Sequence, residues 1–304
     1  MRAGTGRGLA ASWQPLPPID RFPAAPKTLD SFLTPSRISH RVASVVAATF
    51  ASLFLLFLVA PIAELVATGG GSGLRKLTTD AELRSSLWLT LVTATAAVLC
   101  GVAGGTPIAY LLARKQFRGR AVLSAVLDLP LLIPHPVAGI ALLLVLGRNS
   151  VVGGAALDAG LRIVGSPIGI TVAMLFVSAP LYVSGAREAF ARVDPRYEAV
   201  ARTLGDPPWR AFRRVSLPLS MRGLVAAAVV MWARAVSEFG AIVVITYNPK
   251  AASVLSYDRF TSFGLSEALP VAAVLAILSL VPLTVLRALR YGRTAADTGW
   301  AGEG

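Results

Sequence analysis

The sequence predicts an all-α integral membrane protein with six transmembrane helices and a cytoplasmic helix–glycine–helix elbow. Hydrophobic residues make up 55% of the 304 positions, charged residues only 15%, and the mean hydropathy is +0.66, which is unlike a soluble domain. A bilayer core about 30 Å thick requires about 20 apolar residues per helix. A soluble helical bundle would need polar helix faces, which these segments lack. Six segments meet the length requirement: Val42–Ala63, Leu87–Ala113, Ala121–Gly147, Gly165–Ala186, Gly223–Tyr247 and Ala268–Leu286.

The distribution of basic residues predicts the orientation of the chain. With the N-terminus in the cytoplasm, 21 of the 29 Lys and Arg fall on the inner side, seven fall on the outer side, and Arg234 lies within a span. This excess is what the positive-inside rule requires. We therefore expect a multi-pass protein of the cell (cytoplasmic) membrane with both termini in the cytoplasm. The net charge of +13 fits this topology and anionic lipid headgroups, and no nucleic-acid partner is expected.

Composition divides the chain into four parts. Residues 1–38 are rich in Pro, Gly and Ser and predict a disordered cytoplasmic tail. Residues 39–84 hold the first transmembrane helix and an outer loop, 85–290 form the transmembrane core, and 291–304 form a second cytoplasmic tail. The first apolar run is too long for a signal peptide. Cys100 is the only cysteine, so the sequence predicts no intrachain disulfide and gives no basis for a metal site or a nucleophilic cysteine. No catalytic or cofactor-binding residue is predicted either.

The polar segment 192–218, called the elbow, separates the fourth span from the fifth. Asp194 followed by a proline predicts a helix start, and Gly205 predicts its end. Asp206 is expected to cap a second helix that closes at Pro218. Each helix has an apolar edge, and arginines surround both. This pattern fits docking into a groove of a partner and equally fits a helix pair lying on the inner membrane surface. The apolar residues are Tyr197, Val200, Ala201 and Leu204 in the first helix, and Trp209, Phe212 and Val215 in the second.

The elbow resembles the EAA loop of binding-protein-dependent ABC permeases. In that pattern a glycine is followed by nine residues, an aliphatic residue, one further residue and Leu-Pro. Here Gly205 is followed at those positions by Val215, Leu217 and Pro218. The opening Glu-Ala-Ala departs, because Glu198 stands one residue early. The resemblance implies that the elbow docks on an ATP-binding subunit through Glu198, Ala201, Leu204, Gly205, Trp209, Phe212, Arg213, Leu217 and Pro218.

A second resemblance concerns the transported substrate. The run from Trp232 to Pro249, with its Ser-Glu-Phe-Gly core, is similar to the fifth helix of oxyanion permeases. The continuation from Ala252 to Ala272 looks most like the tungstate/molybdate branch, with a sulfate or thiamine permease as the alternative. The likeness covers about Ser85 to Arg290. It implies a homodimer that works with two ATP-binding subunits and an extracytoplasmic binding protein. The chain has no phosphate-binding Gly-x-x-x-x-Gly-Lys-Ser/Thr motif, so it is not expected to be an enzyme.

Charged and polar residues of the fifth span are candidates for the pathway or its gate. Arg234 and Glu238 are four residues apart on one helix face and can pair, and the helical rise places Arg234 about 18 Å beyond Arg222. Buried charges are costly in a membrane, so both should face protein or water. They either line the pathway or fix the rotation of the helix. An anion pathway should not present an unneutralised carboxylate, which favours the structural role. The further candidates are Ser237, Gly240 and Asn248.

The third span contains Pro130, Pro134 and Pro136, which must kink or unwind it. Broken helices often mark translocation paths. His135 lies among these prolines and has only Asp128 as a nearby carboxylate in sequence, so a structural hydrogen bond is favoured over a proton relay.

Two other classes of function remain as alternatives. A proton-coupled secondary transporter would usually carry more acidic residues in the membrane and an internal repeat. An intramembrane enzyme would have to use Asp128 and His135, whose helical spacing the prolines disrupt.

Overall fold

The computed structural model describes residues 37–291, which fold into helices joined by short loops and contain no strand. This confirms the predicted all-α class. The chain divides into two compact units, residues 1–59 and residues 60–304. Of the predicted tails, Arg37, Ile38 and Tyr291 are helical, and the other tail residues lie outside the described range.

The first unit contains the beginning of α2 (Arg37–Thr79). Its described side chains are exposed, including the large apolar Phe50 and Phe57, as expected of a helix that faces lipid. The predicted first span ends at Ala63, but α2 continues to Thr79, so most of the predicted outer loop is helical. Within the second unit, Gly69 and Gly73 of this extension pack against the α13 backbone, which explains why these glycines do not end the helix.

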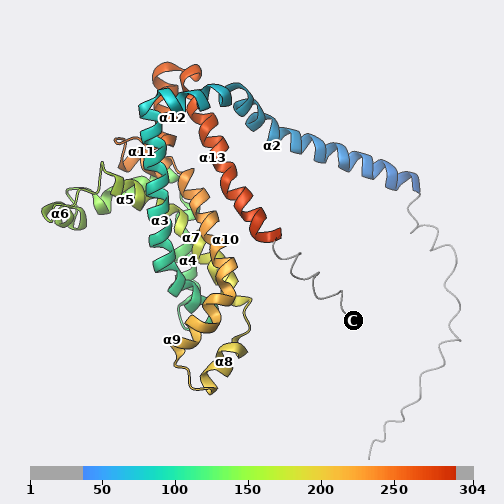
Figure 1. Ribbon diagram of the computed structural model, residues 1–304, viewed down its shortest axis with the longest axis vertical. Helices are drawn as coiled ribbons and strands as arrows, with labels where there is room; N and C mark the ends of the chain where they lie inside the picture. The colour runs from blue at the N-terminus through green and yellow to red at the C-terminus, as the bar shows by residue number, and fades with distance from the viewer. Residues whose placement is uncertain (1–36, 292–304) are drawn as a thin grey trace, which may run out of the picture. The chain divides into compact units, whose positions relative to one another are not determined.

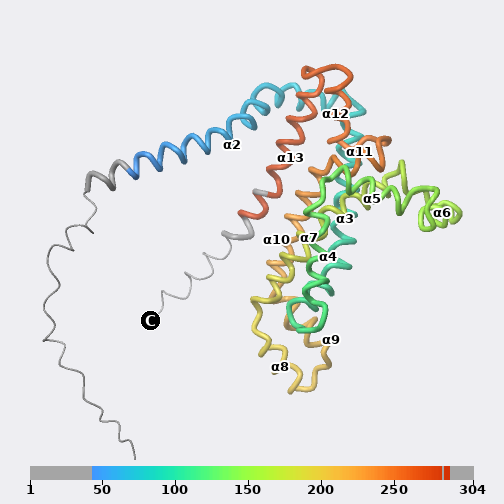
Figure 2. The backbone as a smooth tube through the Cα atoms, turned by 180° about the vertical axis from the view of Figure 1, so that it is seen from behind, coloured from blue at the N-terminus to red at the C-terminus, as the bar shows by residue number. Residues whose placement is uncertain are grey.

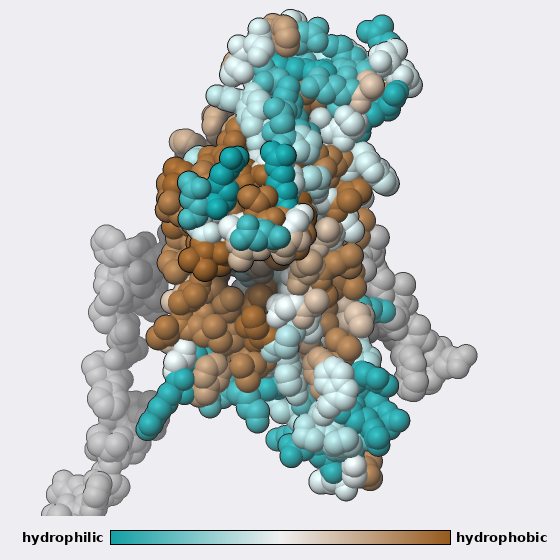
Figure 3. Space-filling view, turned by 90° about the vertical axis from the view of Figure 1, so that its left-hand side faces the viewer, coloured by the Kyte–Doolittle hydropathy of each residue, from teal (hydrophilic) through white to brown (hydrophobic). Residues whose placement is uncertain are grey.

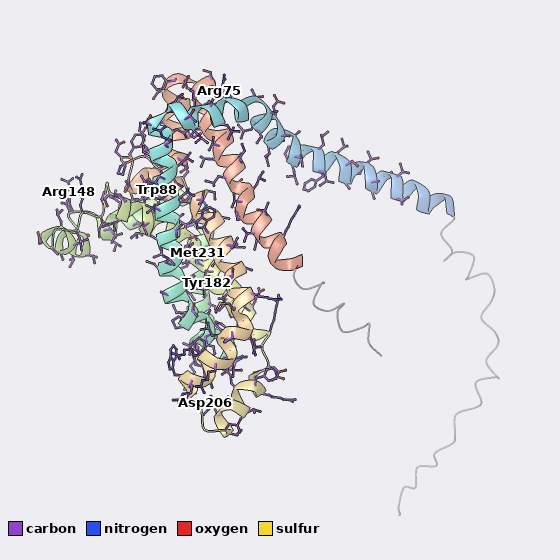
Figure 4. The ribbon with its side chains drawn as sticks, viewed as in Figure 1. Arg75, Trp88, Arg148, Tyr182, Asp206 and Met231 are labelled. Atoms are coloured by element: carbon purple, nitrogen blue, oxygen red, sulfur yellow. The ribbon has the colours of Figure 1, made fainter. Side chains whose placement is uncertain are left out.

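Three long helices form the centre of the second unit: α3 (Ala81–Arg114), α7 (Pro167–Ala191) and α10 (Leu217–Val236). Helix α7 packs along both others, as Figures 1 and 2 show from opposite sides. The buried side chains of Tyr182 and Met231 lie between them (Figure 4). Helices α3 and α7 correspond to the predicted second and fourth spans.

The predicted third span is broken. Helix α4 (Arg120–Leu132) and helix α5 (His135–Leu146) meet at Ile133 and Pro134 with a bend of 113°. The prolines thus have the predicted effect. A short helix, α6 (Val151–Asp158), follows α5.

The predicted fifth span, Gly223–Tyr247, is wrong at both ends. The helical run begins at Pro208 and ends at Val236, and a separate short helix, α11 (Gly240–Ile245), follows. The break at Ser237–Phe239 has no proline, and the polar residues Arg234 and Glu238 beside it are compatible with a continuous helix, so the sequence did not locate it.

The last two helices are α12 (Ala252–Phe263) and α13 (Leu265–Tyr291), of which α13 contains the predicted sixth span. In the described residues, five helices are long and apolar enough to cross a membrane, and the bent α4–α5 pair makes six if it counts as one span. Figure 3 shows a largely hydrophobic belt between two polar ends of one face. The arrangement is that of a multi-pass membrane protein.

Candidate functional site: the elbow and the broken-helix cluster

The first half of the elbow folds as its sequence predicts. The Asp194 carboxylate accepts a hydrogen bond from the Arg196 backbone N–H, at 2.8 Å, and so caps α8 (Pro195–Thr203). Gly205 then adopts a φ of +97°, a conformation that residues with a side chain rarely adopt. The chain reverses here without any steric crowding of the glycine.

The second half differs from the prediction. Asp206 does not cap a helix. Its carboxylate instead lies 3.6 Å from Arg210 and 3.5 Å from Arg214. Helix α9 (Pro208–Ala211) begins after Pro207, and a π-turn, η2 (Phe212–Ser216), joins it directly to α10. The elbow therefore does not close at Pro218, because its second half is the beginning of the fifth span.

The exposed surface of the elbow is apolar at its tip and basic around it. Leu204 is 83% exposed and Trp209 is 68% exposed, although both are large hydrophobic side chains. Asp206, at the end of the second unit opposite Arg75, marks this tip (Figure 4). Of the predicted docking residues, Gly205, Arg213 and Pro218 are also exposed, whereas Ala201, Phe212 and Leu217 are half-buried.

The Glu198 carboxylate is engaged by side chains of the protein itself. It accepts hydrogen bonds from the Tyr110 hydroxyl at 2.7 Å, from Arg114 Nε at 3.0 Å and from the Ser216 hydroxyl. Arg114 also donates to the Val193 carbonyl. Glu198 thus ties α8 to α3 and to the π-turn. The sequence could not show this, because every one of these carboxylate partners is at least 18 residues away.

The environment of Glu198 predicts an acid-sensitive elbow. Burial raises the pKa of its carboxyl, but hydrogen bonds from Ser216 and Tyr110 and the Arg114 charge outweigh burial and hold the pKa below its ordinary 4.5. A depressed carboxyl pKa stabilises the fold above the unfolded value, and this contribution is lost as the pH falls through the folded-state pKa. We expect hydrogen exchange of residues 195–203 to accelerate as the pH falls below 4.5, after correction for the intrinsic exchange rate.

Two variants control that measurement. Glu198→Gln should remove most of the acid-dependent change, because it has no titrating carboxyl. Glu188→Gln should retain it, because Glu188 is an exposed residue paired only loosely with Arg192, at 3.9 Å. An acid response that persists unchanged in Glu198→Gln would contradict the assignment.

A second polar cluster lies where the broken helices meet. Arg234 Nη2 donates to Glu238 Oε2 at 2.7 Å and lies 2.7 Å from His135 Nε2. Its Nη1 is 3.4 Å from the Ser237 hydroxyl. The predicted pair between Arg234 and Glu238 is present, although Glu238 belongs to the break and not to a continuous helix. Gly240 packs so closely that an added Cβ would come within 2.7 Å of His135 Cβ.

The structure brings together four of the five pathway candidates and leaves out Asn248. That residue is exposed in the loop after α11, beside Gly165 at the beginning of α7. Sequence analysis missed His135 as a member of the cluster. Its nearest carboxylate is Glu238, at 3.9 Å, and not Asp128, because folding joins α5 to the break after α10.

Another polar network, which sequence analysis did not predict, lies at the end of the second unit opposite the elbow. The largely buried Arg259 of α12 pairs with Asp80 at 2.7 Å and with Glu82 at 3.1 Å. Lys250 pairs with Asp258 at 2.7 Å. The pKa of the Lys250 ammonium group is raised above its ordinary value, mainly by this hydrogen bond. The Arg259 pairs join α12 to the beginning of α3, and the Lys250 pair joins α12 to the loop before it.

Fold and site together define a class: a multi-pass helical membrane protein with a structured elbow at one end and a polar break within its spans. The sequence pattern of the family described as "Binding-protein-dependent transport system inner membrane component" matches residues 105–291. The chain belongs to this family, which comprises ABC-transporter permeases.

Individual relatives and structures agree with that assignment. The chain is 46% identical over 125 residues, 41% of its length and 51% of the relative's, to a molybdate/tungstate transport system permease protein, WtpB, from Thermococcus kodakarensis. Over 139 residues, 44% of the chain and 50% of the relative, it is 32% identical to the Escherichia coli sulfate transport system permease protein CysT. The chain spans about half the length of these curated relatives.

Two solved transporters share the fold at low sequence identity. A bacterial ABC transporter that imports alginate matches with a TM-score of 0.62 at 17% identity, over 82% of this chain and 94% of that chain. The MetNI methionine transporter matches with a TM-score of 0.55 at 19% identity, over 69% of this chain and 95% of that chain.

Proposed function

We propose that this protein is the permease subunit of an ABC importer that moves a tetrahedral oxyanion, molybdate or tungstate, across the cytoplasmic membrane. The observation that carries the substrate class is the 46% identity to a molybdate/tungstate permease protein. Sulfate is the second candidate, supported by the 32% identity to a sulfate permease protein. Membership of a binding-protein-dependent family favours this function over a proton-coupled secondary transporter.

The elbow is proposed to dock on a cytoplasmic ATP-binding subunit. Its exposed Leu204 and Trp209 provide an apolar knob, and short helices with such anchors fit hydrophobic grooves. The surrounding arginines suit a groove with an acidic margin. Glu198 holds the elbow in place from within and is not itself a docking contact.

The complete transporter is proposed to contain two copies of this permease, two ATP-binding subunits and an extracytoplasmic binding protein. Arg234 is 23% exposed within a span and His135 is 42% exposed beside it. Charged groups at this depth require protein or water as neighbours. A second permease copy facing this cluster would enclose a polar path and shield it from lipid. The distribution of Lys and Arg supports a separate part of the proposal, that both chain termini and the elbow lie on the cytoplasmic side.

Reconstitution of the complete complex tests the function. The permease would be co-expressed with the ATP-binding subunit and binding protein of its own system and placed in liposomes. We expect tungstate and molybdate, but not sulfate, to stimulate ATP hydrolysis and to accumulate. Stimulation by sulfate alone would show that the protein is a sulfate permease subunit. Failure to assemble with an ATP-binding subunit would contradict the proposed function.

A further inference from the structure

The helix breaks of two different spans come together at one place. Helix α4 gives way to α5 at Ile133 and Pro134, and α10 gives way to α11 at residues 237–239. Gly240 contacts His135 and Pro136 across these breaks, and Gly139 of α5 approaches the Ala241 carbonyl. Non-helical backbone at membrane depth is tolerated where protein covers it or where it lines a water-filled cavity, and paired breaks of this kind bind substrates in other transporters.

The acidic member of the cluster is hidden. Glu238 is only 1% exposed. Its Oε2 accepts from Arg234, and its Oε1 accepts from the Ala241 backbone N–H at 2.8 Å. The negative charge is thus fixed behind the guanidinium and is not displayed. This removes the objection that an anion pathway would present an unneutralised carboxylate.

The members of the cluster that remain at least partly exposed, Arg234, Ser237 and His135, are of residue types that can bind anions. Among residues 37–291, Arg234 uses Nη2 for Glu238 and His135, while Nη1 makes only a long contact with the exposed Ser237 hydroxyl. The His135 ring is exposed on the same cluster. A guanidinium presents several N–H donors in a planar arrangement that matches tetrahedral oxyanions. The Ser237 hydroxyl donates to the Arg234 backbone carbonyl at 3.0 Å and would supply a further donor to an anion by turning away from that bond.

We propose that Arg234, Ser237 and His135 form a transit site that contacts the oxyanion during its passage, an inference that rests on the proposed function. Glu238 orients Arg234 and offsets part of its charge. The offset matters, because a path conducts only if its sites bind strongly enough to admit an ion and weakly enough to release it. Two facing permease copies would contribute two such sites.

The double variant Arg234→Gln/Glu238→Gln separates transit from structure. It removes both charges together and so avoids leaving a buried carboxylate without its partner, the main cost of a single substitution. We expect assembly and ATP hydrolysis stimulated by the loaded binding protein to persist, while molybdate uptake into proteoliposomes falls about tenfold or more, because a charge-assisted contact to the moving anion is lost. Arg234→Lys should retain part of the uptake.

Arg222→Gln is the matched control, since it removes an exposed arginine from the same helix and should leave uptake unchanged. Uptake at the wild-type rate in the double variant would overturn the proposal, because it would mean that the pair is only structural. Absence of uptake by the wild-type complex would instead count against the proposed function.

A labelling experiment gives an answer even if the double variant does not assemble. In a Cys100→Ala background, Ser237→Cys would be treated with anionic and cationic thiol reagents of similar size. We expect faster modification by the anionic reagent, and slower modification when molybdate is present. Equal or faster modification by the cationic reagent, or no effect of molybdate, would overturn the transit site.

Discussion

Replacing both Leu204 and Trp209 with aspartate is expected to release the ATP-binding subunits from the membrane complex. Both side chains are exposed and apolar at the tip of the elbow, and anchor residues at an interface commonly contribute about 2 kcal/mol or more each. Two such losses correspond to a decrease in affinity of roughly a thousandfold. Copurification of the ATP-binding subunit with the tagged permease measures this directly, and transport should be lost with it.

The control for that variant is Phe263→Asp. Phe263 is 69% exposed, closely matching the 68% of Trp209, but it belongs to α12, which Figure 1 shows at the end of the second unit away from α8 and α9. It should leave copurification unchanged. Retention of the ATP-binding subunit by the Leu204/Trp209 variant would show that the apolar tip is not the docking surface.

Substitution of Gly205 by valine is expected to uncouple ATP hydrolysis from transport while membrane insertion stays intact. The residue has a φ of +97°, and a side chain in this conformation costs roughly 1–2 kcal/mol, more for a β-branched one. Within the part of the chain that the structure describes, no atom other than those of its chain neighbours lies within 4 Å of an added Cβ, so the strain acts on the turn alone. The ratio of anion imported to ATP hydrolysed is the measurement.

Gly119 supplies a matched control for the backbone effect. It has a φ of +93° and equally open surroundings, but it lies in the loop between α3 and α4. Gly119→Val should therefore transport normally, and Gly205→Asn should recover much of the coupling because asparagine tolerates this conformation. Normal transport by Gly205→Val would mean that the turn has no docking role.

The features that sequence predicted well are those determined by local chemistry. Asp194 followed by Pro195 begins a helix, Gly205 ends one, and three closely spaced prolines break the third span. Each signal acts within a few residues, so one sequence is sufficient to interpret it. Apolar length likewise located the cores of most spans.

The features that sequence missed depend on contacts between distant segments. The break after Val236 has no proline to mark it, so the fifth span was predicted in the wrong position. His135 meets Arg234 across 99 residues, and Glu198 turns inward because Arg114 and Ser216 lie beneath it. The hydrophobic periodicity of a single helix cannot predict such contacts between segments that are far apart in the sequence.

The direct junction of α9, η2 and α10 has a mechanical consequence. From Pro208 to Val236 the chain is one helical run of 29 residues, roughly 43 Å long at 1.5 Å per residue. Trp209 stands in its first turn and Arg234 in its last, with no loop between them. Along the chain α8 joins this run through the turn at Gly205, and across space the Glu198 carboxylate joins α8 to Ser216 within the run. If the elbow docks as proposed, a displacement of its tip would be transmitted to the polar break through this continuous helical run. The bonds from Tyr110, Arg114 and Ser216 to Glu198 would then hold the first turns of this run against α3 while its far end moves.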